Sequence, residues 1–225
     1  ESKEPVPKWH SDVYYYDVLN EKSEKIAGFY LDPYSRPAEK RGGAWMDTCL
    51  DRGQHAGSFV FPVAYLVCNG TPPMGDTPSL LSFDEVETLF HEFGHGLQHM
   101  LTQVDHLEVA GINGIEWDAV ELPSQFMENW CYQKSVIKQL TKHVKTGKSL
   151  PDDLFEKIVR AKTFNAANFM VRQLHFALVD IELHHRFDPK AGAKAEDINR
   201  RIASKVAAVQ PIPEDQSLCT FEHIF

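Results

Sequence analysis

The stretch that most constrains the fold of this chain is His91-Glu92-Phe93-Gly94-His95, in which two histidines stand four residues apart and a glutamate follows the first. On a helix of about 3.6 residues per turn, His91 and His95 project from one face, so both imidazoles can reach one metal ion. Glu92 would then lie beside the metal, free to act as a base. The motif therefore predicts a helix that carries part of a metal site.

The sequence before the motif predicts that this helix begins near Phe83. Ser82 and Glu85 have the spacing of a capping box. Apolar residues then recur at helical spacing, at Val86, Leu89, Phe90, Phe93, Leu97, Met100 and Leu101. Gly94 and Gly96 each weaken an isolated helix by roughly 1 kcal/mol, which indicates that another part of the fold packs against the backbone there. Two histidines on such a helix are more often exposed or hydrogen-bonded than bound to metal, so the metal assignment depends on a third ligand.

A second helical pattern, over residues 117–130, supplies carboxylates on one side. Catalytic zinc usually takes three protein ligands and leaves a position for water, and two histidines with one glutamate are a common set. We expect Glu121 to be the third ligand. Asp118, one helical turn earlier, would accept the outer ring N–H of a ligating histidine, and Glu128 would brace the same face. A solvated or N-terminal charge pattern explains Asp118 and Glu128 equally well. Pro123 fits best within the first turn of this helix.

At these positions the chain resembles the thimet oligopeptidase and oligopeptidase A family of zinc peptidases, and it leans toward the oligopeptidase A branch. Besides the histidine motif, the resemblance rests on residues 118–125, 128–130, 42–47, 62–66 and 221–225. It implies one Zn²⁺ held by His91, His95 and Glu121, with Glu92 as the catalytic base. It also implies that His223 contacts bound substrate and helps to stabilise the oxyanion. A packed terminal histidine is the plain alternative for His223.

The resemblance implies a zincin-like catalytic region of a larger, mostly helical peptidase. We expect a mainly α chain with a small β-sheet, an α+β fold, that forms part of one catalytic domain over residues 1–225. Runs rich in aromatic and β-branched residues place the sheet at about residues 12–69, and the helical zinc-binding region covers about residues 82–225. We expect a fragment, because relatives carry a helical N-terminal portion and a Gly- and Tyr-rich C-terminal segment with no counterpart here.

Two connections and the last third of the chain complete the pattern. Residues 42–44 are either an approach to an edge strand that binds extended peptide or an ordinary turn. Residues 110–114 are either a loop that moves over a bound peptide or a plain loop. Helical sequence covers residues 152–187 and 195–209. Its expected core residues are Leu154, Phe155, Ile158, Phe169, Leu174, Leu178, Ile181 and Leu183.

Composition excludes several classes of function. A formal net charge of −9 argues against a general binder of nucleic acid or anionic membrane, since both favour basic patches. No apolar run approaches the roughly 20 residues that a membrane-spanning helix needs. The four cysteines are scattered and form no C-x-x-C pair, which indicates reduced thiols rather than zinc ligands or a disulfide framework.

The sequence thus predicts a zinc metalloendopeptidase that hydrolyses short unfolded peptides, with Glu92 activating a water. We expect a monomer that acts in the cytoplasm, or in the matrix of a plastid or mitochondrion. Two other functions fit the same residues: a non-catalytic domain that zinc stabilises, and a peptide-binding module. A structural zinc site needs no base at Glu92, and hydrolysis distinguishes the enzyme from both.

Overall fold

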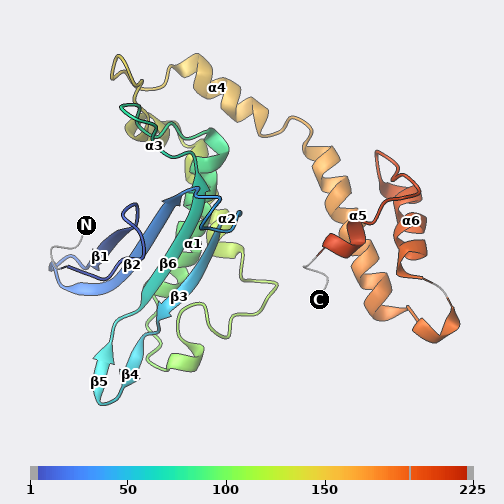
Figure 1. Cartoon of the computed structure of the whole chain (residues 1–225), viewed down its shortest axis with the longest axis horizontal. Helices are drawn as coiled ribbons and strands as arrows, with labels where there is room; N and C mark the ends of the chain where they lie inside the picture. The colour runs from blue at the N-terminus through green and yellow to red at the C-terminus, as the bar shows by residue number, and fades with distance from the viewer. Residues whose placement is uncertain (1–4, 193, 222–225) are drawn as a thin grey trace. The chain divides into compact units, whose positions relative to one another are not determined.

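The small sheet expected from residues 12–69 is present in the computed structural model, which describes residues 5–192 and 194–221 (Figure 1). Its strands, in order across the sheet, are β1 (Tyr14–Leu19), β2 (Lys25–Tyr34), β6 (Val63–Gly70) and β3 (Trp45–Leu50). β2 runs parallel to β6, whereas β1 and β3 are antiparallel to their neighbours. Between β3 and β6 the chain forms a separate hairpin of β4 (Gly53–His55) and β5 (Ser58–Val60).

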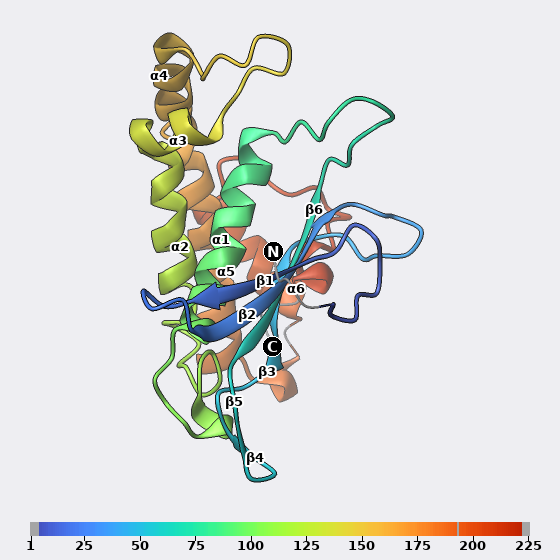
Figure 2. The same ribbon diagram turned by 90° about the vertical axis from the view of Figure 1, so that its left-hand side faces the viewer.

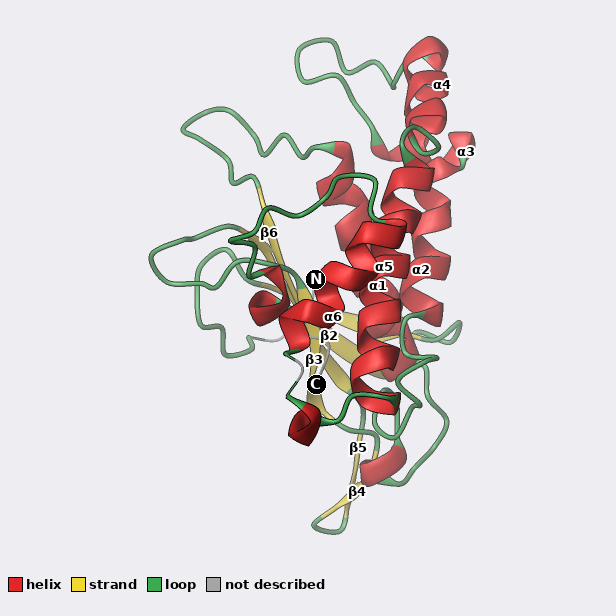
Figure 3. Ribbon diagram, turned by 90° about the vertical axis from the view of Figure 1, so that its right-hand side faces the viewer, coloured by secondary structure: helices red, strands yellow, loops and turns green. Residues whose placement is uncertain are grey.

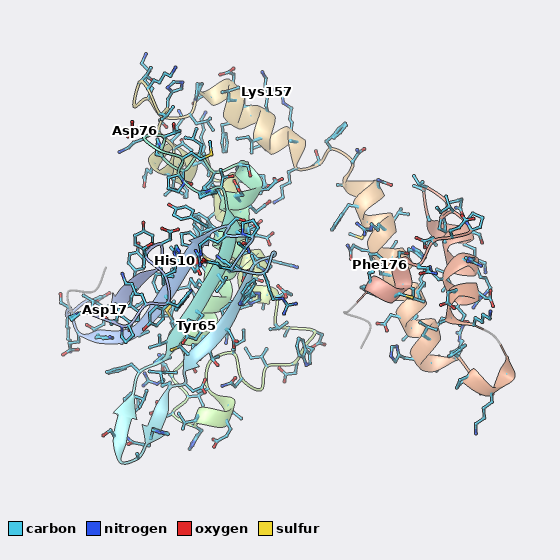
Figure 4. All side chains as sticks on the ribbon, in the orientation of Figure 1. His10, Asp17, Tyr65, Asp76, Lys157 and Phe176 are labelled. Atoms are coloured by element: carbon cyan, nitrogen blue, oxygen red, sulfur yellow. The ribbon has the colours of Figure 1, made fainter. Side chains whose placement is uncertain are left out.

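The two faces of the sheet carry different side chains because successive residues of a strand point to opposite sides. Tyr30 of β2 and Tyr65 of β6 are paired in register, and Trp9 packs on both rings with centroid distances of 5.3 and 5.5 Å (Tyr65 is labelled in Figure 4). The neighbouring residues Phe29 and Leu66 pack into the hydrophobic core on the other face. β6 reads as an almost unbroken apolar run because both of its faces are covered.

Helix α1 (Phe83–Met100) covers the sheet and carries the histidine motif (Figure 2). It begins with the predicted capping box, in which the Glu85 N–H donates to Ser82 Oγ at 3.2 Å and the Ser82 N–H donates to Glu85 Oε2 at 2.6 Å. Phe93, Leu97 and Met100 pack into the core formed with β2 and β6. The apolar stripe of α1 therefore fixes which face of the helix turns away from the sheet.

The second helical segment differs from the expected one. Helix α2 is confined to Leu122–Glu128, and a 3-10 turn at Asn129–Tyr132 leads into α3 (Lys134–Leu140). The sequence left the start of this helix open, and the structure places it at Leu122: residues 117–121 of the helical pattern form turns, and Glu121 is the N-cap of α2. Pro123 lies in the first turn as expected, where a missing N–H removes no helical hydrogen bond.

A buried ionic cluster holds the end of β2. The Asp32 carboxylate is 2% exposed and accepts hydrogen bonds from the Arg36 guanidinium at 2.7 and 2.8 Å and from Lys40 Nζ at 3.0 Å. Trp9 Nε1 donates to the same carboxylate at 3.0 Å. Burial alone would raise the pKa of Asp32, but these donors outweigh it and hold the pKa at about 2.

The chain separates into two compact units, residues 1–151 and 152–225, and the second is built on α4 (Asp152–Ala161), α5 (Ala166–His185) and α6 (Ala195–Val206). α5 and α6 pack together through Val179, Ile198 and Ile202 (Figures 1 and 3). Phe176 of α5 stacks on Phe221 with a centroid distance of 4.6 Å (Figure 4).

The helical region expected over residues 152–187 forms two helices, α4 and α5, and Asn165 between them adopts a left-handed conformation with φ of +57°. Several expected core side chains of this region are exposed, namely Leu154, Phe169, Leu174, Leu178 and Ile181. α5 packs on α6 through a stripe centred on Val179, and the four exposed side chains of α5 lie outside that contact. Leu154 belongs to α4, and the cluster between α5 and α6 contains no described residue of α4. Among the described residues, no helix combines the length and apolar character needed to cross a bilayer.

Candidate metal centre and active site

Three side chains named from the sequence converge at one point of the first unit. His91 and His95 lie on successive turns of α1, and each Nε2 is 3.2 Å from Oε2 of Glu121. One ligand atom from each of the three residues lies within 4.8 Å of the other two. Because α1 and α2 arrive from different parts of the chain, the convergence depends on how closely their backbones approach.

Two glycines of α1 set how closely the neighbouring elements approach its backbone. A Cβ on Gly94 would lie 2.5 Å from Cα of Ser124 and 2.6 Å from the Pro123 carbonyl oxygen, so only glycine lets α2 come this near. A Cβ on Gly96 would lie 2.9 Å from Leu66 Cδ2 on the sheet side. The crowding predicted from these glycines is thus confirmed, and it has two sources, α2 and the sheet.

Ser124 orients the third carboxylate, a role that the sequence reasoning missed. Its hydroxyl is fully buried and lies 2.8 Å from Oε2 of Glu121 and 2.9 Å from the Glu121 carbonyl oxygen. The hydroxyl of a serine three residues after the glutamate that caps a helix N-terminus can reach back to that glutamate. This spacing of Glu121 and Ser124 is the sequence signal that could have identified the role of Ser124.

The outer nitrogen of His91 is held by Glu128, whose Oε1 lies 2.7 Å from Nδ1. A carboxylate there favours the tautomer in which Nδ1 donates its proton and Nε2 keeps a lone pair. His95 Nδ1 is buried and has no hydrogen-bond partner among the described residues.

The structure does not bring Asp118 to either histidine. Its side chain is exposed, and the hydrogen bonds of residues 5–192 and 194–221 include none between Asp118 and His91 or His95. The one-turn offset from Glu121 does not apply, because residues 117–121 form turns instead of helix. His223 lies outside the described residues.

Electrostatics separate the roles of the neighbouring groups. Glu92 is 5% exposed, and burial raises its pKa to about 7, with the Glu121 carboxylate adding to the rise and His91 opposing it. Burial also lowers the pKa of His95 below its ordinary value, against the attraction of Glu121. A neutral imidazole is the form that binds a metal ion.

The donor set fits a divalent transition metal. Two imidazole nitrogens and one carboxylate oxygen converge, which is a three-ligand set typical of catalytic zinc. None of the four cysteines belongs to the cluster, and none of them forms a disulfide.

The convergent groups line an open cleft of about 600 Å³. His91, Glu92 and His95 of α1 lie on one side, and the lining also includes Ala44, just before β3, and the first two residues of β3, Trp45 and Met46. A further wall comes from the loop between α1 and α2, with Ile112, Asn113, Gly114, Ile115 and Trp117. Trp117 is 91% exposed and stands beside the cleft with its ring uncovered in this unit.

Comparison with known proteins matches the model of peptidase family M3 to residues 1–225. The chain belongs to peptidase family M3. The resemblance drawn from the histidine motif and the run after it is therefore confirmed, and so is the α+β architecture expected with it.

Several family members share about half of the residues. The chain is 53% identical to organellar oligopeptidase A, chloroplastic/mitochondrial, of Arabidopsis thaliana, over 98% of this chain and 28% of that protein. It is 52% identical to a probable cytosolic oligopeptidase A of the same plant, over 98% of the chain and 32% of the relative. Oligopeptidase A of Escherichia coli is 47% identical over 99% of the chain and 33% of the relative. The chain thus spans about a third of the length of these M3 relatives.

Proposed function

We propose that this chain carries the catalytic centre of a zinc-dependent endopeptidase that hydrolyses short unfolded peptides. The observation that carries the proposal is the convergence of His91, His95 and Glu121 next to a buried Glu92 in an open cleft. Membership of family M3 and the names of the oligopeptidase A relatives support a metallopeptidase.

In this proposal His91, His95 and Glu121 hold one Zn²⁺, with Ser124 and Glu128 keeping two of the ligands in place. When bound, the ion supplies Lewis acidity, which polarises a carbonyl oxygen and lowers the pKa of a water. The short hydrogen bond from His91 Nδ1 to Glu128 raises the basicity of Nε2 toward the metal.

Glu92 acts as the general base. Its carboxylate takes a proton from the attacking water and passes that proton to the nitrogen of the leaving amine, so no covalent enzyme intermediate is needed. Burial raises the pKa of Glu92 in the metal-free protein, which makes its carboxylate a stronger base than that of an exposed glutamate.

The substrate would bind as an extended strand along β3. β3 pairs with β6 on one side and is the last strand of the sheet, and its first residues line the cleft. An edge strand supplies main-chain hydrogen bonds that do not depend on side-chain identity, which suits peptides of varied sequence. We further propose that the protein acts as a monomer in the cytosol or in the matrix of a plastid or mitochondrion. The name of one plant relative contains the word cytosolic, and that of another contains chloroplastic/mitochondrial.

The experiment that tests the function measures cleavage of an internally quenched peptide by the zinc-loaded full-length protein and by its Glu92→Gln variant. We expect the variant to bind one zinc and lose at least about 99% of the activity, since removal of a general base costs about 10²- to 10⁴-fold. Glu108→Gln, a change at an exposed glutamate outside the cleft, is the matched control and should leave the rate unchanged.

Either of two results would contradict the proposal. Hydrolysis that survives in Glu92→Gln would remove the general base from the mechanism. Peptide binding without hydrolysis in the zinc-loaded wild type would favour a binding module or a domain that zinc merely stabilises.

A further inference from the structure

The two sides of the cleft are joined by contacts that the proposed chemistry does not use. One side is the start of β3, and the other is the loop at residues 112–117 between α1 and α2. The loop and β3 are far apart along the chain, so contacts between side chains have to set their distance in space. That distance is the width of the cleft in which an extended peptide would lie.

The first of these contacts is made by His99, which follows His95 by one turn of α1. Its ring is fully buried, and Nε2 lies 2.9 Å from the carbonyl oxygen of Leu50, the last residue of β3. On its other side the ring contacts Gly111, where any Cβ would collide with the imidazole and where φ is +64°. The helix that carries the metal motif therefore holds both the end of β3 and the start of the loop.

The second contact is made by Asn113, which itself lines the cleft. Its Nδ2 donates to Oδ1 of Asp51 at 2.7 Å and to the carbonyl oxygen of Leu107 at 3.3 Å. Asp51 directly follows β3, so this side chain connects the loop wall to the strand wall. Both residues are half-buried, which makes the hydrogen bond stronger than an exposed one.

A third contact between the end of β3 and the loop lies away from the cleft and can be compared with the contact of Asn113. Arg52 Nε lies 2.6 Å from Oδ1 of Asp105, again between the end of β3 and the loop. Neither Arg52 nor Asp105 lines the cleft, and Asp105 is 53% exposed. An exposed ion pair of this kind contributes little to stability.

We propose that Asn113 is a positioning residue for the substrate: through its hydrogen bond to Asp51 it sets the distance between the loop and the edge of β3. An extended peptide lying between the two is thereby placed in register with His91, His95 and Glu121. This inference rests on the proposed function, because it assumes that the cleft receives a peptide. Gly111 and Gly114, both with positive φ, let the loop turn so that Asn113 reaches Asp51.

The test exchanges the two partners in the full-length protein. Asn113→Asp sets two carboxylates against each other, and adding Asp51→Asn restores a donor and an acceptor with their direction reversed. We expect Asn113→Asp to raise KM for a ten-residue peptide roughly tenfold with a smaller change in kcat, and the double exchange to recover most of the loss. Asp105→Asn removes the ion pair with Arg52, which lies outside the cleft, and should leave KM unchanged.

Two measurements without hydrolysis keep this inference separate from the proposed function. The first is the Kd of a fluorescent peptide for the metal-free protein by anisotropy, and the second is hydrogen exchange of the amides at residues 110–115. Both should follow the same order of variants as KM. If the wild type binds peptide but does not cleave it, the proposed function fails while these readouts still decide the role of Asn113.

Three results would overturn the role of Asn113. One is unchanged peptide affinity and loop exchange in Asn113→Asp, and another is an equal loss in Asp105→Asn, which would show a general effect on stability. The third is a double exchange that recovers nothing.

Discussion

Among single residues, the buried hydroxyl of Ser124 orients the carboxylate of Glu121. It donates one hydrogen bond in a position where both the side chain and the main chain of Glu121 offer acceptors. We expect Ser124→Ala to weaken zinc binding by about 10- to 100-fold, because the carboxylate loses the group that orients it. Competition with a chromophoric chelator measures this affinity.

The matched control for that substitution is Ser135→Ala, which removes an exposed hydroxyl from α3 and leaves the site untouched. Equal zinc affinity in Ser124→Ala and Ser135→Ala would show that Glu121 keeps its position without help.

The buried carboxyl of Glu92 should make the stability of the metal-free protein depend on pH. Its pKa is raised to about 7 in the folded state, from 4.5 in an exposed carboxyl. A raised pKa contributes stability that is fully present below pH 4.5 and is lost as pH rises through 7, because the native state then has to hold a buried charge. Each pKa unit corresponds to about 1.4 kcal/mol, so the loss amounts to about 3 kcal/mol.

We therefore expect Glu92→Gln to be more stable than the wild type at pH 8, by up to about 3 kcal/mol, and the advantage to shrink toward pH 5. Urea unfolding of the two metal-free proteins at several pH values measures it. A difference that is constant with pH would mean that the carboxyl of Glu92 does not titrate as its burial indicates.

At the scale of elements, the site depends on the crossing of α1 and α2 at Gly94. A methyl group at this position meets the main chain of Pro123 and Ser124, so the helices would have to separate. We expect Gly94→Ala to lower the free energy of unfolding by about 1–3 kcal/mol, as overpacking does, and to weaken zinc binding as well, because Glu121 moves with α2. Chemical denaturation and zinc titration measure the two effects.

Gly42→Ala is the control for that change, since the structure shows open space around Gly42 and its φ is not positive. A Gly94→Ala protein that is destabilised yet keeps wild-type zinc affinity would separate the packing role of the crossing from its role in the site.

Local signals predicted some elements of this fold and missed others. The capping box at Ser82 fixed the start of α1, and the apolar repeat fixed the face that packs on the sheet, because both depend on residues a few positions apart. The charge pattern at residues 117–130 left the start of α2 open; Pro123 marked its first turn, and residues 117–121 form turns instead of helix. The hydrogen bond between Asn113 and Asp51 joins residues distant in the chain, and no pattern in the sequence indicates it.

At the scale of the whole molecule, every described residue of the proposed centre lies in the unit of residues 1–151. A ligand that binds only the folded state stabilises the part that holds it. We expect added zinc to slow hydrogen exchange in α1 and at residues 112–122 of the full-length protein, and to leave α6 unchanged. Mass spectrometry of the exchanging amides with and without zinc measures this pattern. Equal protection in both units would contradict a centre confined to the first.

The sequence also predicted the long-range convergence of His91, His95 and Glu121, which needs contacts across 30 residues of chain. That prediction rested on the usual ligand set of catalytic zinc, two histidines and one glutamate, and on the resemblance to a zinc peptidase family. The exposed apolar positions of α5 were predicted as core because periodicity gives the apolar face of a helix without saying what covers it.

The most direct measurement of the central claim is zinc K-edge X-ray absorption of the zinc-loaded full-length protein, with Glu121→Ala beside it. We expect nitrogen and oxygen donors at about 2.0–2.1 Å, with the multiple scattering of two imidazoles and no sulfur. We also expect Glu121→Ala to lose one oxygen donor or to fail to retain zinc. A sulfur shell near about 2.3 Å, or an unchanged spectrum in Glu121→Ala, would contradict the claim that His91, His95 and Glu121 hold the metal.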